Sequence, residues 1–336
     1  MRLFVIIICS FFSVFSYAQN LAGKVVTENN EPIFGATVYF DGSTIGTTTN
    51  EEGKFILPIK STTNATLIVS YVGYEKVYLS NIDITKRYVI KLVESVTNLN
   101  NVVVEKPKFS REEMLKVFRN QFIGKTKAAK NCKIKNEDEI YFSYDSKTFI
   151  FYAYSDVPLE IQNDYLGYIV YFDLKIFEVQ FPSYTLNESN LITSSYFGTS
   201  RFESYKEDKK TLKNREEVFE GSSPQLFRSI AKGEENGKFK YFKRGFLVPF
   251  NNVFSVKDSI GSTYVSMIPE KKNSIVKEIA VDILDTKKRQ SKIVFKTNDF
   301  FVDKFGLYTQ YNKILFGGYL SEKKLADMLP SDYNME

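Results

Sequence analysis

Four charged residues near the middle of the chain are the first candidates for chemistry. Arg215, Glu216 and Glu217 are consecutive, and Arg228 follows in the next helical stretch. Two carboxylates that flank one glycosidic bond can hydrolyse it, one as acid and the other as base or nucleophile. Neighbouring residues on a helix point about 100° apart, so Glu216 and Glu217 do not face one bond together. A hydrolase would therefore need a distant carboxylate beside one of them.

The chain contains no histidine. This excludes a Ser-His-Asp or Cys-His triad, a histidine-ligated zinc and a histidine proton shuttle. The two cysteines are Cys9, near the N-terminus, and Cys132, so a thiolate metal cluster is excluded as well. Oxygen ligation of Ca²⁺ or Mg²⁺ stays open, but no calcium-loop series is present. We expect no cofactor and no metal, and we assign no catalytic residue.

A run of basic residues is a second candidate site. From Met114 to Asn136 the chain has seven basic residues and no acidic one. Ser110 and Glu113 form a capping box that begins a helix here, and the candidate basic surface on that helix and beyond it consists of Lys116, Arg119, Lys127 and Lys130. It could contact anionic lipid, lipopolysaccharide or nucleic acid. We favour a helix docked by its aromatic side with its lysines in water, because Gly124 interrupts it, and we expect no nucleic-acid partner.

The first eighteen residues resemble a signal for export. They contain one basic residue, Arg2, then an apolar run from Leu3, and they end on the small residue Ala18. Such a leader is too short to span a membrane, and no later segment resembles a span. A lipid anchor on Cys9 is disfavoured, because Ile8 precedes it where a small residue is expected. We expect an exported protein, in the periplasm or associated with the outer membrane.

The length beyond the leader predicts two domains, at about 150 residues each. The 30 Phe and 22 Tyr of the chain supply core material. Pro107 and the capping box after it mark the best boundary. The expected organisation is a signal peptide at 1–18, a β-sandwich at 19–105 and a second domain at 106–336.

Residues 19–105 consist of short β-rich runs between turn signals, which predicts a small antiparallel β-sandwich. Four blocks occur in order, namely GKVV at 23–26, EPIFGATV at 31–38, GTTTNEEGKF at 46–55 and LIVSYVGY at 67–74. With these blocks the region resembles the carboxypeptidase regulatory-like domain, a transthyretin-like sandwich. The resemblance implies a Bacteroidota envelope protein, because such domains begin many TonB-dependent receptors there, and LNNVVVE at 99–105 is similar to the segment that follows in them. The rest of the chain is too short for a plug and a barrel.

The GTTTNEEGKF block has two interpretations, an ion site and a turn. Asn50 and Gly53 flank Glu51 and Glu52, which suits a reversal between two strands. A calcium site would need further oxygen ligands at fixed offsets. We predict the tip of a hairpin with two solvated glutamates.

After residue 106 the pattern predicts an α+β region with antiparallel sheet and a few helices, so the whole chain is expected to be mainly β. Aromatic strands follow the first helix, and a further β-rich series occupies 238–320. Between them, 213–237 is helical and bends at Gly221, with Ser223 as the cap of the second helix and Pro224 at its first position. The repeated Tyr and Phe could stack sugar rings, although on a sheet they more often form core.

These features favour a non-enzymatic binding or assembly protein of the cell envelope. The sandwich would dock on an envelope protein or a glycan, and the second region would supply the specific surface. Two alternatives stay open, a carbohydrate-active or peptidoglycan-directed hydrolase with paired carboxylates and a carbohydrate-binding module. A continuous apolar or aromatic surface patch would favour binding, and a pocket with two carboxylates, one of them desolvated, would favour hydrolysis.

Overall fold

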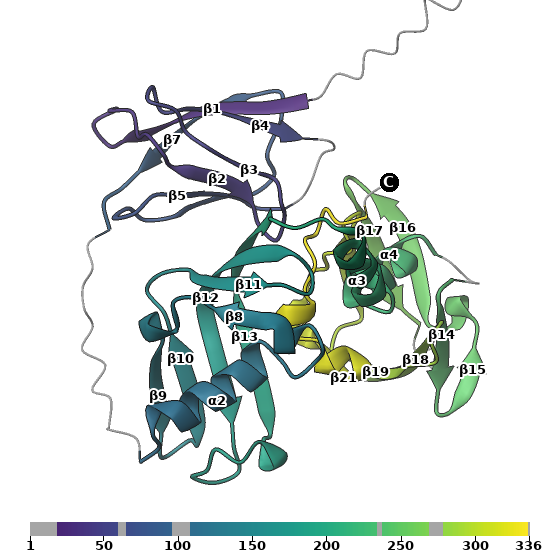
Figure 1. Cartoon of the computed structure of the whole chain (residues 1–336). Helices are drawn as coiled ribbons and strands as arrows, with labels where there is room; N and C mark the ends of the chain where they lie inside the picture. Colours follow the sequence, from purple (N-terminus) through teal and green to yellow (C-terminus); the bar gives the residue numbers. More distant parts are fainter. Residues whose placement is uncertain (1–18, 60–64, 96–107, 234–236, 269–277, 335–336) are drawn as a thin grey trace, which may run out of the picture.

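The computed structural model describes residues 19–59, 65–95, 108–233, 237–268 and 278–334. The predicted signal at 1–18, the LNNVVVE segment and the boundary at Pro107 lie outside these residues. The described chain is mainly β and built on several antiparallel sheets, which confirms the predicted fold class. Three hydrophobic cores hold it together, one in the sandwich and two in the region after residue 108 (Figure 1).

The sandwich has one sheet of order β4-β1-β7 and another of order β3-β2-β5-β6. Its strands are β1 (Gln19–Thr27), β2 (Thr37–Phe40), β3 (Gly46–Thr48), β4 (Lys54–Ile59), β5 (Leu67–Ser70), β6 (Val77–Leu79) and β7 (Arg87–Leu92). Strand β4 alternates exposed and buried residues, as a strand with one face on a core does. The pairing of β1 with β4 is antiparallel, but β1 pairs with β7 in parallel, so the sandwich is not purely antiparallel.

The GTTTNEEGKF block forms the predicted turn, but the strands β3 and β4 on either side of it lie in different sheets, so it is not the tip of a hairpin. The Asn50 side-chain oxygen accepts hydrogen bonds from the N–H groups of Glu52 (3.1 Å) and Lys54 (2.9 Å). Gly53 adopts φ +73°, and an added Cβ would lie 2.5 Å from the Val25 carbonyl oxygen, so only glycine fits. Glu51 and Glu52 are exposed, and in the described part of the chain no group of three or more Cys, Asp or Glu side chains could hold a metal ion.

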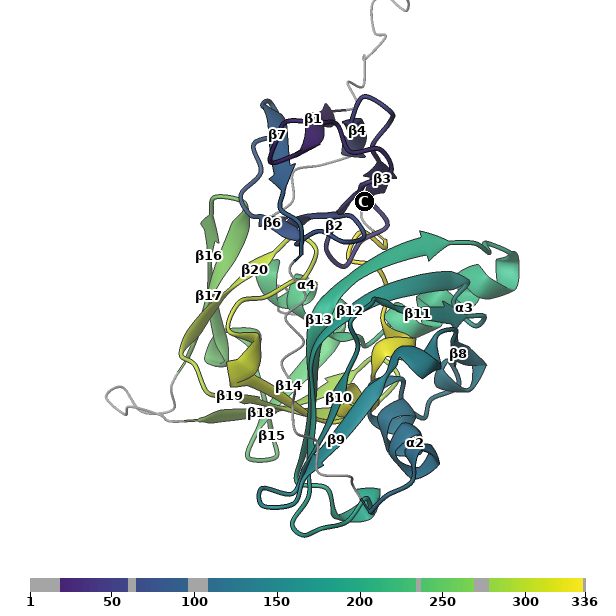
Figure 2. The same cartoon turned by 90° about the vertical axis from the view of Figure 1, so that its left-hand side faces the viewer.

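The second core lies between helix α2 (Arg111–Phe122) and a sheet of order β8-β11-β12-β10-β9, in which β13 also pairs with β12. The strands are β8 (Cys132–Ile134), β9 (Tyr141–Asp145), β10 (Ile150–Tyr154), β11 (Leu159–Asn163), β12 (Tyr168–Gln180) and β13 (Thr193–Ser204). The predicted capping box at Ser110 and Glu113 is present. Phe118 and Phe122 of α2 pack on sheet residues such as Phe177 and Phe172, and both views show α2 on one face of this sheet (Figure 2).

The third core lies between helix α4 (Ser223–Ala231) and two further sheets, of orders β15-β14-β18-β19-β21 and β16-β17-β20. Their strands are β14 (Phe239–Lys243), β15 (Phe246–Val248), β16 (Phe254–Ser259), β17 (Ser262–Met267), β18 (Ile279–Asp285), β19 (Gln290–Phe295), β20 (Asp299–Asp303) and β21 (Ile314–Gly318). Helix α3 (Lys209–Phe219) precedes α4, and α5 (Tyr319–Glu322) follows β21. Short 3₁₀ turns connect several of these elements, among them η5 (Tyr311–Lys313) and η6 (Leu325–Asp327).

Helices α3 and α4 separate at Gly221, as predicted, but the cap lies one residue earlier than expected. Ser222 is the cap, because its hydroxyl accepts a hydrogen bond from the Gln225 N–H, and the helix begins at Ser223. Gly221 has φ +72°, a left-handed conformation that ends α3 at low steric cost.

Candidate functional site

The predicted cluster of Arg215, Glu216, Glu217 and Arg228 does not form. Arg215 is 3% exposed, whereas Glu216 and Glu217 are exposed to solvent. Among the described contacts, neither arginine pairs with either glutamate. Arg228 instead donates hydrogen bonds to the carbonyl oxygens of Phe305 (2.9 Å) and Ser331 (2.8 Å).

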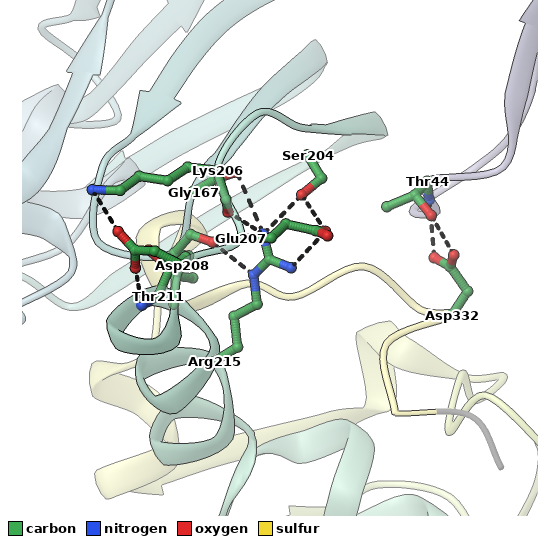
Figure 3. A network of polar contacts seen from close by, with 10 residues as sticks. Thr44, Gly167, Ser204, Lys206, Glu207, Asp208, Thr211, Arg215 and Asp332 are labelled. Carbon is green, nitrogen blue, oxygen red and sulfur yellow. Dashed lines mark hydrogen bonds and ion pairs between the residues drawn. The ribbon is translucent and has the colours of Figure 1, made fainter.

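Arg215 is a structural residue that ties α3 to the second sheet (Figure 3). Its Nε donates to the Leu166 carbonyl (2.8 Å), and one terminal nitrogen donates to the Ser204 hydroxyl (2.9 Å) and the Lys206 carbonyl (3.0 Å). The guanidinium lies 3.8 Å from the centre of the Tyr168 ring. Its donors are therefore used within the fold, so Arg215 is not available to a substrate.

The predicted basic surface is exposed but partly neutralised. Lys116, Arg119, Lys127 and Lys130 all reach solvent. Arg119 forms a two-pronged ion pair with Glu137, whose hydrogen bond raises the pKa of the arginine. Glu137 follows the basic run in the sequence and lies beside Arg119 only in the folded chain. The sequence therefore did not reveal this counter-charge.

A shallow cavity of about 320 Å³ lies beside α2 and is lined by Arg119, Lys125, Lys130, Cys132 and Glu137, among others. Lys125 pairs with Glu188 (3.0 Å). Burial, with smaller contributions from Asp327 and Asp164, raises the pKa of the Cys132 thiol to about 12. The thiol is therefore protonated at neutral pH and is not an activated nucleophile.

The sandwich is fastened to the second sheet through the loop after β2. The Ser200 N–H donates to the Asp41 carboxylate (2.7 Å), and the Phe202 N–H donates to the Ser43 carbonyl (3.0 Å). The C-terminal segment joins this contact, since Asp332 accepts hydrogen bonds from the backbone and hydroxyl of Thr44, as Figure 3 shows. Loop, strand β13 and C-terminal segment thus form one continuous polar contact.

Asp173 of β12 forms a second contact with the sandwich. Its carboxylate is buried and pairs with Lys76 of the sandwich (2.7 Å) and with Lys175 (3.1 Å). Burial and the charge of Asp173 raise the pKa of Asp41 to about 6, although backbone N–H groups of Ser200 and Gly42 oppose the shift. Two desolvated carboxylates that interact are one feature of a hydrolytic pair, but here both are engaged in holding the sandwich.

The outer face of the second sheet, opposite α2, carries a row of exposed aromatic and apolar side chains. Tyr141 of β9 pairs with Tyr154 of β10, and Ile176 of β12 pairs with Phe197 of β13. Tyr154 and Ile176 lie one row beyond the Tyr152↔Glu178 pair, on the same side of the sheet. We call this surface the aromatic face, and it consists of Tyr141, Tyr152, Tyr154, Ile176, Phe197 and Tyr311.

Ring stacking extends the aromatic face from the sheet of β8 to β13 onto η5, which directly precedes β21 of the third core. Tyr152 and Tyr154 stack at 6.1 Å with planes 17° apart, and Phe197 stacks on Tyr311 of η5 at 5.3 Å with planes 5° apart. Tyr152 is half-buried, and the exposed fractions of the other five run from 42% for Phe197 to 58% for Tyr311. The alternating positions that share this face on β9, β10, β12 and β13 include Asp145 and Glu178. Its cations, Arg201 of β13 and Lys175 at the bulge of β12, pair with Glu203 and Asp173. The face is therefore apolar with a weakly acidic character.

The sandwich matches a known domain family. Residues 21–104 match the family model of the CarboxypepD_reg-like domain. This confirms the domain that the sequence blocks indicated. The CarboxypepD_reg-like domain is a non-catalytic β-sandwich of the regulatory, binding type, and the matched residues include β2 and the loop that docks on β13.

Comparison with curated proteins gives no match. Among solved structures, one match is the crystal structure of a C-terminal interface mutant of a type II cohesin-X-dockerin complex from Acetivibrio cellulolyticus, at 20% sequence identity and a TM-score of 0.18. The match covers 22% of this chain and 51% of that chain, so this chain spans about half the length of the structure it resembles. A TM-score this low does not support a conclusion about fold or function.

Proposed function

We propose that this chain is an exported, non-enzymatic binding protein of the cell envelope, in which the aromatic face holds a protein partner. The observation that supports it most is the row of exposed rings that crosses four strands. A contiguous apolar surface of this kind is uncommon on a protein that has no partner. The row includes the aliphatic Ile176, and its rings stack within two pairs, Tyr152 with Tyr154 and Phe197 with Tyr311. A surface of this kind suits a flat protein partner better than a sugar chain.

The charge of the aromatic face limits the classes of partner that it can bind. With Asp145 and Glu178 on it, and with its cations Arg201 and Lys175 already paired with acids, the face would repel lipopolysaccharide, nucleic acid or another polyanion. The partner surface is therefore apolar and neutral or basic. The CarboxypepD_reg-like domain, held on β13 by the loop after β2, would give this partner a second contact at a fixed position.

The envelope location rests on the leader and on the family resemblance. A cleavable signal at 1–18 and a Bacteroidota origin with TonB-dependent receptors as neighbours are both part of this proposal. In the described part of the chain no helix is long and apolar enough to cross a membrane. Fractionation of cells that express the full chain should recover a protein that begins at Gln19 in the envelope; full-length protein in the cytosol would contradict export.

The partner is tested with the tagged chain from residue 19 onward in a pull-down from native envelope. The face variant carries Tyr141→Ser and Tyr154→Ser, and the matched control carries Phe246→Ser and Leu247→Ser, which remove two apolar side chains on β15 that are even more exposed. We expect the wild type and the control to capture the same envelope protein and the face variant to lose it. Capture by all three, or by none, would contradict the proposal.

A neutral glycan is the second candidate, because Tyr141 and Tyr154 lie beside hydroxyl side chains such as Ser143 and could stack on sugar rings. Co-sedimentation with a neutral polysaccharide tests it with the same variants. Retention that the face variant loses, without capture of any protein, would favour the glycan over the protein partner. The hydrolase receives no support from Glu216 and Glu217, which lie exposed on α3 without a partner carboxylate among the described contacts.

A further inference from the structure

A cavity of about 270 Å³ lies where the second and third cores meet. Val218, Met328 and Leu329 line it from the second core, and Phe316 and Leu320 line it from the third. Pro224, in the first turn of α4, completes the apolar part of the wall. Junctions between structural units are frequent places for ligand sites.

The polar part of the wall holds more positive than negative charge. It contains Ser222, Ser223, Lys323, Lys324 and Asp327. Asp327 already accepts hydrogen bonds from the Thr126 hydroxyl (2.9 Å) and from the Lys323 ammonium (3.1 Å). Lys323 and Asp327 therefore compensate each other, and neither leaves a charge for a ligand.

Lys324 is the uncompensated group. Its ammonium makes no hydrogen bond or ion pair within the described residues, and burial lowers the pKa of this ammonium with no opposing interaction. Its stem packs on Gly124, where an added Cβ would lie 3.1 Å from the Lys324 Cβ. A partly buried, unpaired ammonium is costly unless an anion joins it.

We propose that this cavity binds a small amphipathic carboxylate, with its apolar body against Leu320, Phe316 and Met328 and its carboxylate between Lys324 and the Ser223 hydroxyl. The head group is a carboxylate because one unpaired cation balances one negative charge, whereas a phosphate monoester carries up to two. The start of α4 adds a favourable dipole at the same place. Tyr196 of β13 also lines the cavity, on the side of the sheet opposite Phe197, and the proposal does not depend on the function of the aromatic face.

Such a ligand would touch both cores at once. Because it binds only when the walls are together, it stabilises the junction between the two units by mass action. We therefore expect it to raise the unfolding temperature of the whole chain. This effect separates binding in the cavity from adsorption on an exposed surface.

The probes are hexanoate, its neutral analogue hexanamide and hexyl phosphate, measured by saturation-transfer NMR and by thermal unfolding of the full chain. We expect hexanoate to bind saturably and to raise the unfolding temperature, and hexanamide to bind about tenfold more weakly or worse, a difference of about 1.4 kcal/mol. Lys324→Met should abolish the preference for hexanoate, while Lys313→Met, an exposed lysine on η5, should leave it unchanged.

Lys324→Met should not lower the unfolding temperature without ligand, because it removes an unpaired charge and keeps the stem. Loss of binding in this variant therefore reports on the ammonium and not on misfolding. Equal binding of hexanoate and hexanamide, unchanged binding by Lys324→Met, or no saturable binding at millimolar hexanoate would overturn the site. Tighter binding of hexyl phosphate than of hexanoate would overturn its assignment to carboxylates.

Discussion

The fold buries Arg215 and partly buries Asp41, and it compensates these two charges differently. Arg215 reaches three backbone carbonyls and the Ser204 hydroxyl, which share its charge. Asp41 accepts hydrogen bonds from the backbone N–H groups of Ser200 and Gly42, but it also feels the negative charge of Asp173, and within the described residues no ion pair offsets this charge. The first residue is well satisfied, whereas the second remains sensitive to pH.

The raised pKa of Asp41 predicts a stability that depends on pH. In the unfolded chain the carboxyl titrates near its ordinary value of 3.8, and in the folded chain it titrates at about 6. The folded state therefore holds the proton more tightly, and this contribution to stability is full below pH 4 and is lost as the pH rises through 6. Asp41→Asn keeps the acceptor for Ser200 and removes the charge, so it should stabilise the protein by about 2 kcal/mol at pH 7.5 and by little at pH 4.

Chemical denaturation of both proteins at the two pH values measures the difference. Asp138→Asn, an exposed residue on another turn, is the matched control and should show no such difference. A gain from Asp41→Asn that is equal at both pH values would contradict a titrating Asp41.

The connection between α3 and α4 is fixed both by local capping and by contacts with the hairpin of β18 and β19. Gly221 reverses the chain with φ +72°, and an added Cβ would lie 2.3 Å from the Asp285 carboxylate. Arg289 pairs with that carboxylate (2.5 Å) and donates to the Glu220 carbonyl at the end of α3 (2.7 Å). The hairpin of β18 and β19 thus fixes the angle between two helices that belong to different cores.

The position of the cap makes a prediction for α4. Ser222→Ala removes the hydroxyl that accepts from the Gln225 N–H and should cost about 1 kcal/mol of stability. Ser223→Ala changes the same residue type one position later, where no capping bond exists, and should cost much less. Urea denaturation followed by circular dichroism measures both, and a larger loss for Ser223→Ala would restore the cap that the sequence suggested.

Across the whole molecule, the chain leaves the second core after α3, builds the third core, and returns to the second core at its end. Leu325, Ala326 and Leu329 pack with residues of α2 and the second sheet. Next to them, Ser331 and Asp332 contact the sandwich loop. The segment from 325 to 332 therefore links the sandwich to the second core, and the cavity with Lys324 lies beside this link.

Leu325→Ala tests whether the C-terminal segment packs in the second core. Leu325 is 1% exposed, so its truncation should cost about 2–5 kcal/mol through lost burial and the cavity left behind. Leu315→Ala, at 44% exposure on β21, should cost within about 1 kcal/mol. Equilibrium unfolding measures both, and equal losses would contradict the packing of Leu325 in the second core.

The sequence by itself determined the features that depend on near neighbours. The turn at Asn50 to Gly53, the capping box at Ser110 and the break at Gly221 are set by hydrogen bonds and backbone angles within a few residues, so their patterns can be read directly. The sandwich was also predictable, because its alternating strands and turn signals follow one another closely. The cap at Ser222 was displaced by one residue, since Ser222 and Ser223 are equal candidates until the helix direction is known.

Only the tertiary structure decided what the charged and aromatic residues do. Glu137 neutralises Arg119, and Asp173 meets Asp41 and Lys76, because segments far apart in sequence come together. The same period-two pattern on β9 to β13 placed Phe142 in the core and Tyr141 on the aromatic face, and sequence cannot tell which side a helix will cover. The unpaired Lys324 became visible for the same reason, since the lack of a partner is a property of the whole fold.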